Sequence, residues 1–261
     1  MARTILFIAV LTFAINCKII NAIALHCRFE TVQDIYICSA TTLIETQTNQ
    51  DVTGVFGAHQ SGKGNADVHA LTVFSQNLQF FPTNIEGFFP NLEFINFYNN
   101  SIPSVSNRNL TPFPNLWYLG LTKNRISALD RNLFSGLNTL REVFLNDNDI
   151  ISIDSNLLAG LNAATLIDLS NNRIRHVGHD LILPEKGVIR LLNNSCVNTS
   201  IPVDNVEAVK DFIFDLLLNC PPTISLIEST LESRPNFIQD LMDRIAVLER
   251  IIESDALKAN G

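Results

Sequence analysis

The sequence has few basic residues and only one long apolar segment. Its 261 residues include 18 Lys and Arg against 26 Asp and Glu, which gives a net charge of −8. Nucleic-acid binding depends on clustered positive charge that neutralises phosphates, so no nucleic-acid partner is expected. Beyond the N-terminal run, the most apolar segment is 212–218, which Asp215 interrupts. A membrane-spanning helix needs about 20 apolar residues, so we expect no membrane span.

Motifs for catalysis and metal binding are also missing. There is no HExxH sequence, no serine elbow and no Cys-x2-Cys pair. Residues 57–63 fit the pattern GxxxxGK, but Gly64 stands where a phosphate-binding loop needs Ser or Thr, so we interpret the segment as a glycine-rich loop. His176, His179 and Asp180 are interpreted as solvated loop residues. The sequence therefore predicts a protein that is not an enzyme and has no cofactor or metal.

The middle of the chain repeats one template every 24 residues. Each copy places apolar residues at three positions of a strand, followed by Asn and then Ile; the copies start at Leu92, Leu116, Leu140 and Ala164. This is the leucine-rich repeat pattern. It predicts an α/β repeat fold: a curved solenoid with a parallel β-sheet on its concave face. Weaker copies near Val68 and Ile189 extend the array to six rungs, with a possible seventh around Val52 and Val55.

A recurring Asn ends the strand of each copy. We predict a structural ladder formed by Asn100, Asn124, Asn148, Asn172 and Asn194, with Gln76 in the corresponding position of the first copy. The amide has two donor hydrogens and an acceptor oxygen, so it can pair with backbone groups of adjacent coils. A buried group left unpaired costs about 1–3 kcal/mol, which explains why this position is so restricted.

The N-terminus has the pattern of a secretory signal peptide. An apolar run from Ile5 to Ile15 is followed by small residues, so we predict a signal peptide at 1–24, with cleavage after Ala24 or alternatively after Ala22. Cleavage would leave 16 basic and 26 acidic residues, a net charge of −10. An uncleaved anchor is the alternative. We expect a secreted, extracellular glycoprotein with sequons at Asn99, Asn109, Asn193 and Asn198.

Four cysteines remain once Cys17 leaves with the signal peptide. Of the three possible pairings we predict Cys27–Cys38 and Cys196–Cys220, because each pair flanks one end of the array. The ends need protection, since a terminal coil has an uncovered apolar face. The predicted organisation is a signal peptide at 1–24, an N-terminal cap at 25–67, repeats at 68–195, a C-terminal cap at 196–222 and an amphipathic helical tail at 223–261.

The outward positions of the strands carry an unusual number of aromatic residues. They are Phe74, Phe94, Tyr98, Tyr118 and Phe144. Neighbouring strands lie about 4.8 Å apart, which would set Phe74 beside Tyr98 and Phe94 beside Tyr118, with Phe144 diagonal to Tyr118. We predict that these side chains bind a protein partner; the alternative is that they stack only to stabilise the sheet. A glycan on Asn99 would crowd the half that contains Phe74 and Tyr98.

The C-terminal tail has a helical pattern. Apolar residues recur at alternating spacings of 3 and 4, at Ile238, Leu241, Ile245, Leu248 and Ile252. Such a helix would either pack on the last coil or pair with another chain, as a homo- or hetero-oligomer through residues 236–253.

Residues 25 to about 220 resemble small secreted leucine-rich repeat proteins of insects, especially those of Diptera. The resemblance lies in Cys27 with Tyr36-Ile37-Cys38 and in the segments at 52–59, 88–92 and 191–196. Some mosquito relatives are immune factors that act through partners and carry a longer coiled-coil tail. The resemblance implies an extracellular, non-enzymatic binding module with a role in innate immune recognition. The alternative is an extracellular matrix protein that self-associates through its C-terminal helix.

Overall fold

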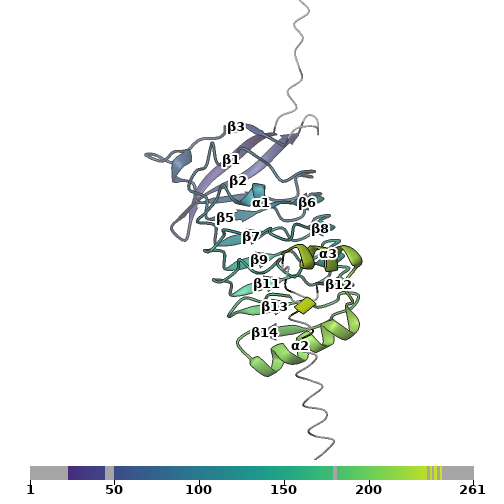
Figure 1. Cartoon of the computed structure of the whole chain (residues 1–261). Coiled ribbons are helices and arrows are strands. Elements are labelled where there is room, and N and C mark those ends of the chain that lie inside the picture. Colours follow the sequence, from purple (N-terminus) through teal and green to yellow (C-terminus); the bar gives the residue numbers. More distant parts are fainter. Residues whose placement is uncertain are drawn as a thin grey trace, which may run out of the picture.

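The chain folds as a solenoid of stacked coils (Figure 1). The structure, a computed structural model, describes residues 23–44, 50–178, 181–233, 236, 238, 239 and 242. One sheet of ten strands runs along the solenoid in the order β14-β13-β11-β9-β7-β5-β4-β2-β1-β3. The strands are β1 (Ile23–Val32), β2 (Ile35–Ile44), β3 (Val52–Phe56), β4 (Ala70–Val73), β5 (Phe94–Asn96), β7 (Tyr118–Gly120), β9 (Glu142–Phe144), β11 (Leu166–Asp168), β13 (Val188–Arg190) and β14 (Ser200–Pro202). The predicted leucine-rich repeat solenoid is confirmed.

The repeat region contains six parallel strands, one in each coil: β4, β5, β7, β9, β11 and β13. Their register follows the 24-residue period over the first five, since the register partners are Leu71, Ile95, Leu119, Val143 and Ile167 in turn. All five of these side chains are buried. Successive residues of a strand point to opposite faces of the sheet, so their neighbours in the strand face outward. The weaker copies near Val68 and Ile189 are thus the first and last of these rungs.

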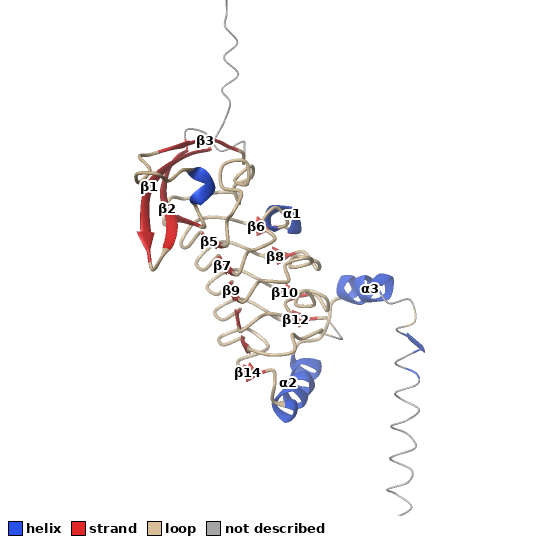
Figure 2. Cartoon of the chain, turned by 90° about the vertical axis from the view of Figure 1, so that its left-hand side faces the viewer, coloured by secondary structure: helices blue, strands red, loops and turns tan. Residues whose placement is uncertain are grey.

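The back of the coils is built from short elements (Figure 2). Strands β6 (Ser104–Val105) and β8 (Ala128–Leu129) pair in parallel, as do β10 (Ser152–Ile153) and β12 (His176–Val177). One turn of helix, α1 (Asn107–Leu110), completes this side, whereas a 3-10 turn, η1 (Asn65–Asp67), precedes β4. Apolar residues between them close the core, including Phe113, Leu133, Phe134, Leu157 and Leu158. Each coil therefore buries its apolar face against its neighbours.

The Asn ladder links successive coils. In the coil of β7, Asn124 accepts a hydrogen bond at Oδ1 from the Ile102 backbone N–H at 3.1 Å. Its Nδ2 donates to the carbonyl of Phe97 in the preceding coil at 2.9 Å and to that of Leu121 at 3.0 Å. The same arrangement recurs at Asn100, Asn148, Asn172 and Asn194. Gln76, in the first of these coils, donates from its side chain to the Phe74 carbonyl.

A row of left-handed turns lies directly before the Asn ladder, one turn in each coil, and the sequence interpretation missed it. The residue before each ladder position has a left-handed backbone, with φ between 54° and 57°: Ser75, Asn99, Lys123, Asp147, Asn171 and Asn193. Left-handed backbone is uncommon outside glycine and turns the chain sharply. The polar residue directly before each ladder position is the sequence signal for this turn.

At the N-terminus, β1 and β2 form an antiparallel hairpin closed by the predicted Cys27–Cys38 disulfide. Strand β2 pairs in parallel with β4, and β3 pairs with β1 at the outer edge of the sheet. The interpretation of Val52 and Val55 as a seventh rung is therefore wrong. The hairpin occupies the place next to the first rung, so β3 can add only beyond it.

The glycine-rich segment at 57–64 is a loop fixed to this cap. His59 stacks on Phe29 with ring centroids 3.8 Å apart, and its Nδ1 lies 3.1 Å from the Tyr36 hydroxyl. The Lys63 ammonium lies 5.1 Å from the centre of the Tyr36 ring. Only the three-residue turn η1 follows the loop, whereas a phosphate-binding loop opens a longer helix.

At the C-terminus, β14 pairs antiparallel with β13, and helix α2 (Val206–Asn219) covers the last coil. The Asn205 side chain caps α2 by accepting from the Ala208 N–H, and Phe212 and Leu216 are buried. The predicted Cys196–Cys220 disulfide ties the end of α2 to the coil. Helix α3 (Ile224–Ser233) follows.

Most of the predicted tail stripe lies outside the described residues: Leu241, Ile245, Leu248 and Ile252. Ile238 is described and is exposed. Within the described ranges, the structure contains no helix that is long and apolar enough to cross a membrane.

Candidate binding surface on the concave face

Three aromatic side chains from adjacent strands form a platform on the outward, concave face of the sheet. Phe94 on β5 and Tyr118 on β7 are register partners, and their rings stack at 4.0 Å with an interplanar angle of 12°. Phe144 on β9 lies 5.3 Å from the Tyr118 ring. We call Phe94, Tyr118 and Phe144 the aromatic platform. Trp117 borders it, 5.6 Å from Phe94 and 5.8 Å from Tyr118.

Gly120 leaves room for the platform. It is the register partner of both Asn96 and Phe144. A Cβ atom at this position would lie 2.7 Å from the Asn96 Oδ1 and 2.9 Å from the Tyr118 Cε1. Both distances are shorter than real Cβ contacts, so any larger residue would displace the amide and the Tyr118 ring. The absence of a side chain at Gly120 therefore allows the Tyr118 ring to lie over Gly120.

A second aromatic group lies toward the N-terminal end of the same face. Phe74 and Tyr98 meet edge to face at 6.2 Å, and we call them the Phe74/Tyr98 pair. The Lys123 ammonium lies 5.4 Å from the centre of the Tyr98 ring. Such a contact between a cation and an aromatic ring is attractive because the ring face is electron-rich. The chain thus supplies its own cation to Tyr98.

The platform is instead bordered by a carboxylate. Glu142 on β9 is the register partner of Tyr118, on the side away from Phe94. Burial raises the pKa of the Tyr118 hydroxyl, and the negative charge of Glu142 raises it further. On the next two rungs, the Asp168 carboxylate of β11 lies 3.8 Å from the guanidinium of its register partner Arg190 on β13. The half-buried Glu142 side chain, in contrast, makes no ion pair or hydrogen bond with any residue that the structure describes.

The sequence predicted the relative positions of the five aromatic residues but not these surroundings. Strand alternation predicts that Glu142 points outward. The 24-residue period predicts that Glu142 lies beside Tyr118 on the neighbouring strand. The repeat pattern does not specify side-chain conformations. These conformations determine the space above Gly120, the place of Lys123 and the lack of a partner for Glu142 among the residues that the structure describes.

Three of the four predicted glycosylation sites are exposed: Asn99, Asn193 and Asn198. Asn99 belongs to an open polar groove of about 490 Å³ that Lys123 also lines, and its Nδ2 donates to the Ser75 hydroxyl at 2.7 Å. Asn109 is half-buried as the third residue of α1, where its Oδ1 accepts from the N–H of Ser106, the residue before the helix. A glycan on Asn99 would therefore stand next to the Phe74/Tyr98 pair and its lysine.

Comparison with known proteins agrees with the repeat architecture. Residues 118–174 match the family described as Leucine rich repeat, and this segment contains three of the six rungs described above. The chain thus has the leucine-rich repeat fold, and its central segment matches the family in sequence. No curated protein matches its sequence.

Two solved leucine-rich repeat structures are similar at low identity. One is a chain of the Toll–Spatzle complex of Drosophila, with 14% identity and a TM-score of 0.42 over 57% of this chain and 23% of that one. The other is the leucine-rich repeat ectodomain of the receptor kinase SOBIR1 from Arabidopsis thaliana, with 18% identity and a TM-score of 0.37 over 65% of this chain and 79% of that one. The present chain thus spans about a quarter of the Toll–Spatzle chain that it matches.

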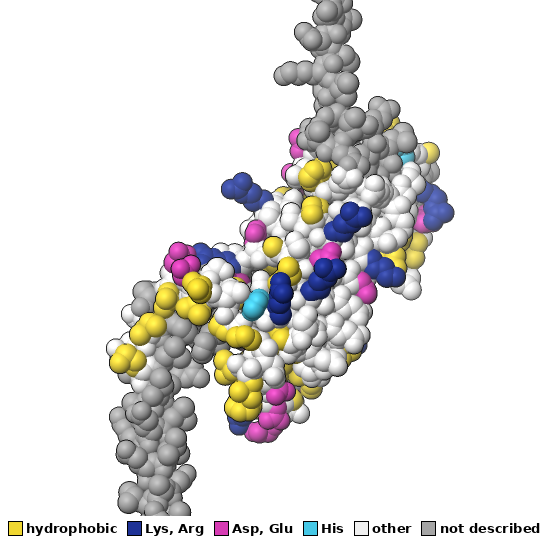
Figure 3. Space-filling view, turned by 90° about the vertical axis from the view of Figure 1, so that its right-hand side faces the viewer, with side chains coloured by type: hydrophobic (Ala, Val, Ile, Leu, Met, Phe, Trp, Pro, Cys, Tyr) yellow, Lys and Arg dark blue, Asp and Glu magenta, His cyan; other side chains and the backbone are white. Residues whose placement is uncertain are grey.

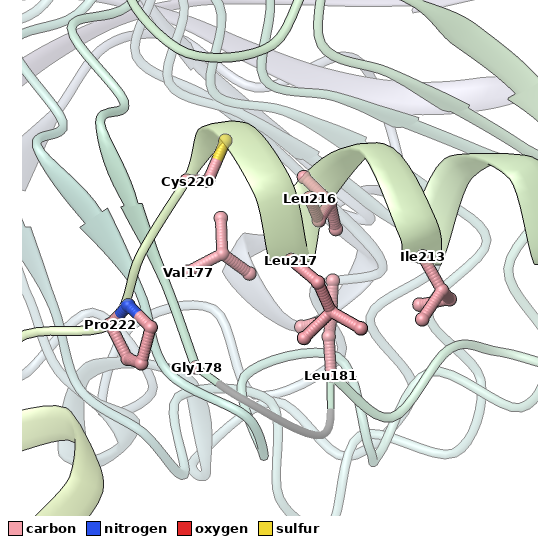
Figure 4. A pocket seen from close by; sticks show the side chains of 8 residues that line it. All are labelled: Val177, Gly178, Leu181, Ile213, Leu216, Leu217, Cys220 and Pro222. Atoms are coloured by element: carbon pink, nitrogen blue, oxygen red, sulfur yellow. The ribbon is translucent and has the colours of Figure 1, made fainter. Parts of the chain in front are cut away.

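The repeat protein also has a small apolar pocket beneath α2 (Figure 4). Val177, Leu181, Leu216 and Leu217 are among the side chains that line it. The space open to the centre of a water-sized sphere is about 10 Å³, which is room for no more than one water molecule. The pocket therefore cannot hold a small-molecule ligand.

No group of three or more His, Cys, Asp and Glu side chains suited to a metal ion occurs among the residues described. His176 lies at the start of β12 with its Nδ1 2.8 Å from the Pro221 carbonyl, whereas His179 and Asp180 lie outside the described residues.

Exposed apolar side chains gather at the C-terminal end, over α2 and α3 (Figure 3). On α2 they are Val206, Phe214, Leu217 and Leu218, and on α3 they are Ile224 and Ile227. Phe214, Leu217 and Leu218 are spaced three and four residues apart and share one side of the helix. Exposed apolar patches of this kind are a common feature of interaction surfaces.

Proposed function

We propose that this leucine-rich repeat protein is a secreted, non-enzymatic module that binds a protein partner on its concave face. The aromatic platform carries the proposal, because three outward aromatic side chains from adjacent strands form one continuous surface. Large aromatic side chains contribute strongly to protein–protein binding. Innate immune recognition is the biological setting that the resemblance to insect proteins favours.

The core does not need these rings in order to close. The buried residues between the platform positions, Ile95, Leu119 and Val143, already fill the inner face of the sheet. Stacking can stabilise a sheet by about 0.2–1 kcal/mol per cross-strand pair, so a structural contribution and a binding role are compatible. The test must therefore separate folding from binding.

Affinity capture from extracellular fluid, followed by mass spectrometry, would compare two variants with the unchanged protein. In the first, Phe94, Tyr118 and Phe144 are changed to Ser; in the second, the exposed apolar residues Phe214, Leu217 and Leu218 are changed to Ser. The proposal predicts that a partner is retained by the unchanged protein and by the second variant and lost from the first. Circular dichroism and thermal unfolding must show that both variants fold. Retention of the same partner by a folded first variant would reject the proposal.

The proposed secretion makes a specific prediction about the cleavage site. Ile23 begins β1 with its side chain 5% exposed, and its N–H donates to the Asp51 carbonyl at 3.0 Å. Cleavage after Ala24 would remove this residue from the sheet, whereas cleavage after Ala22 would leave β1 whole. We therefore favour Ala22. N-terminal sequencing of the protein from culture medium should give Ile-Ala-Leu-His, and a start at Leu25 would contradict this choice.

The exposed apolar side chains of α2 and α3 favour a second candidate function, self-association as an extracellular matrix component. Sedimentation of chains with and without residues 223–261 distinguishes the two. A self-associating matrix protein should form oligomers that depend on the tail and should show little selectivity for partners.

A further inference from the structure

The geometry points to a basic protein segment as the partner, with an arginine or lysine side chain that pairs with Glu142 beside Tyr118 and Phe144. This inference rests on the proposed function and specifies the chemistry of the partner. It depends on three observations: the place of Glu142 beside the aromatic rings, the absence of a partner for its carboxylate among the described residues, and the contrast with neighbouring positions where the chain supplies its own cation.

The first observation concerns the place of Glu142. The Tyr118 ring is stacked on Phe94 at 4.0 Å, and Glu142 is the register partner of Tyr118 on the opposite side. Phe144, two residues further along β9, lies 5.3 Å from the Tyr118 ring. Glu142 therefore stands at the corner of a surface bounded by two aromatic rings. A carboxylate and aromatic ring faces both attract a guanidinium or ammonium group.

The second observation is that the half-buried Glu142 carboxylate has no partner among the described residues. A partly desolvated charge without a counter-ion is unfavourable, and a cation brought by a partner would relieve that cost. The whole chain also carries a net charge of −8, which would attract a basic segment over a longer range.

The third observation is an internal comparison. Asp168, on the next rung, lies 3.8 Å from Arg190 of the rung after it. Tyr98, on the rung of β5, has the Lys123 ammonium 5.4 Å from its ring centre. The chain thus forms both kinds of contact internally, a carboxylate with a cation and a ring with a cation. At Glu142 and Tyr118 the two acceptors are adjacent, and no cation from the described residues contacts them.

Trp117 allows a direct test, because it is the only tryptophan of the chain and lies 5.8 Å from Tyr118. Hexa-arginine would be titrated into the full-length secreted protein while Trp117 fluorescence is recorded. The inference predicts a saturable change, and binding about tenfold weaker in Glu142→Gln, in line with a hydrogen bond to a charged group. Glu86→Gln is the matched control, since it removes the same charge from an exposed position on the loop between β4 and β5.

Hexa-arginine binding that is lost in Glu142→Gln and kept in Glu86→Gln supports the inference. Equal weakening in both variants would overturn it, because only net charge would then matter. A saturable response to a neutral oligosaccharide, with none to hexa-arginine, would also overturn it. Thermal unfolding must show that both variants are folded.

The natural partner separates this inference from the proposed function. If the platform variant with three serines loses the partner while Glu142→Gln retains it with unchanged affinity, the proposed function stands and the inference fails. If both variants retain the partner, the proposed function and the inference are both rejected.

Discussion

The concave face carries two groups of aromatic side chains that differ in the charges around them. In the Phe74/Tyr98 pair the rings meet edge to face, and Lys123 lies over Tyr98. In the aromatic platform Phe94 and Tyr118 stack face to face beside the Glu142 carboxylate, which pairs with no residue in the described part of the chain. The same scaffold thus gives one group an internal cation and the other an open anionic corner. The position of each residue in the repeat determines which rings meet. The neighbouring charges then distinguish the Phe74/Tyr98 pair, which has an internal cation, from the aromatic platform, which is open to a cation of a partner.

The largest expected effect tests the scaffold that the two groups share. Asn124→Ala removes the acceptor for the Ile102 N–H and the donor to the carbonyls of Phe97 and Leu121. The variant leaves the Ile102 N–H unpaired, which costs about 1–3 kcal/mol, whereas the carbonyls of Phe97 and Leu121 keep their bonds from Asn100 and Asn148. The two lost bonds to these carbonyls cost about 0.5–1.5 kcal/mol each, so the free energy of unfolding should fall by about 2–6 kcal/mol. Urea denaturation measures this loss. Gln76→Ala, in the first of the parallel rungs, should cost far less, and an equal cost would contradict the role assigned to the ladder.

Gly120→Val should damage the platform and spare the Phe74/Tyr98 pair. The added side chain must displace Tyr118 and the Asn96 amide, so stability should fall by about 1–3 kcal/mol and the fluorescence of Trp117 should change. Hexa-arginine binding should weaken as well. Gly64→Ala is the control, because no atom lies within 4 Å of its added Cβ. Normal binding and fluorescence in a folded Gly120→Val variant would show that the ring positions do not matter.

Lys123→Glu should give the Phe74/Tyr98 pair the same kind of charge, a carboxylate, that borders the aromatic platform. It removes the cation over Tyr98 and places a carboxylate on the residue that supplied it. A second, weaker hexa-arginine site should appear, with a total gain in binding of roughly two- to fivefold. Isothermal titration calorimetry would report the stoichiometry. A stoichiometry that stays at one would indicate that charge is not what separates the two groups.

The smallest effect concerns the ionisation of Tyr118. Burial and Glu142 raise the pKa of its hydroxyl above the ordinary value of about 10. The folded state therefore holds this proton more tightly than the unfolded state. The resulting stability is fully present below pH 10 and is lost as the pH rises through the folded pKa.

Ultraviolet difference titration of the unchanged protein against Tyr118→Phe isolates this group. Glu142→Gln should lower the pKa of Tyr118, because it removes the negative charge that helps to raise it. A Tyr118 titration that Glu142→Gln leaves unchanged would place the carboxylate too far from the ring for the proposed contact.

Much of the fold was predictable because the repeat period constrains it. Leu119 and Asn124 recur at fixed positions, so their burial and hydrogen bonds follow from the pattern, and the two disulfides follow from the need to close both ends. The N-terminal edge was not predictable in the same way. Val52 and Val55 have the apolar spacing of a rung, but the hairpin of β1 and β2 occupies the place beside β4.

The candidate surface was predictable only in its outline. The register gave the outward direction of Phe94, Tyr118 and Phe144, because strand alternation is independent of side-chain identity. The cation over Tyr98 comes from Lys123, which has a left-handed backbone in a turn, and a repeat template does not specify where a long flexible side chain will lie. Helix α2 could have been found from its Asn205 cap and the helical spacing of its buried residues.

The most direct measurement is a double-mutant cycle between Glu142 and a cationic side chain of the ligand. A peptide with a single arginine would be compared with the same peptide containing citrulline, against the unchanged protein and Glu142→Gln, with Trp117 fluorescence as the readout. Direct contact predicts that the two changes are not additive, with a coupling energy of about 0.5–3 kcal/mol. Additive losses would show that Glu142 does not contact the basic group, and this would contradict the assignment of the aromatic platform as a site for basic segments.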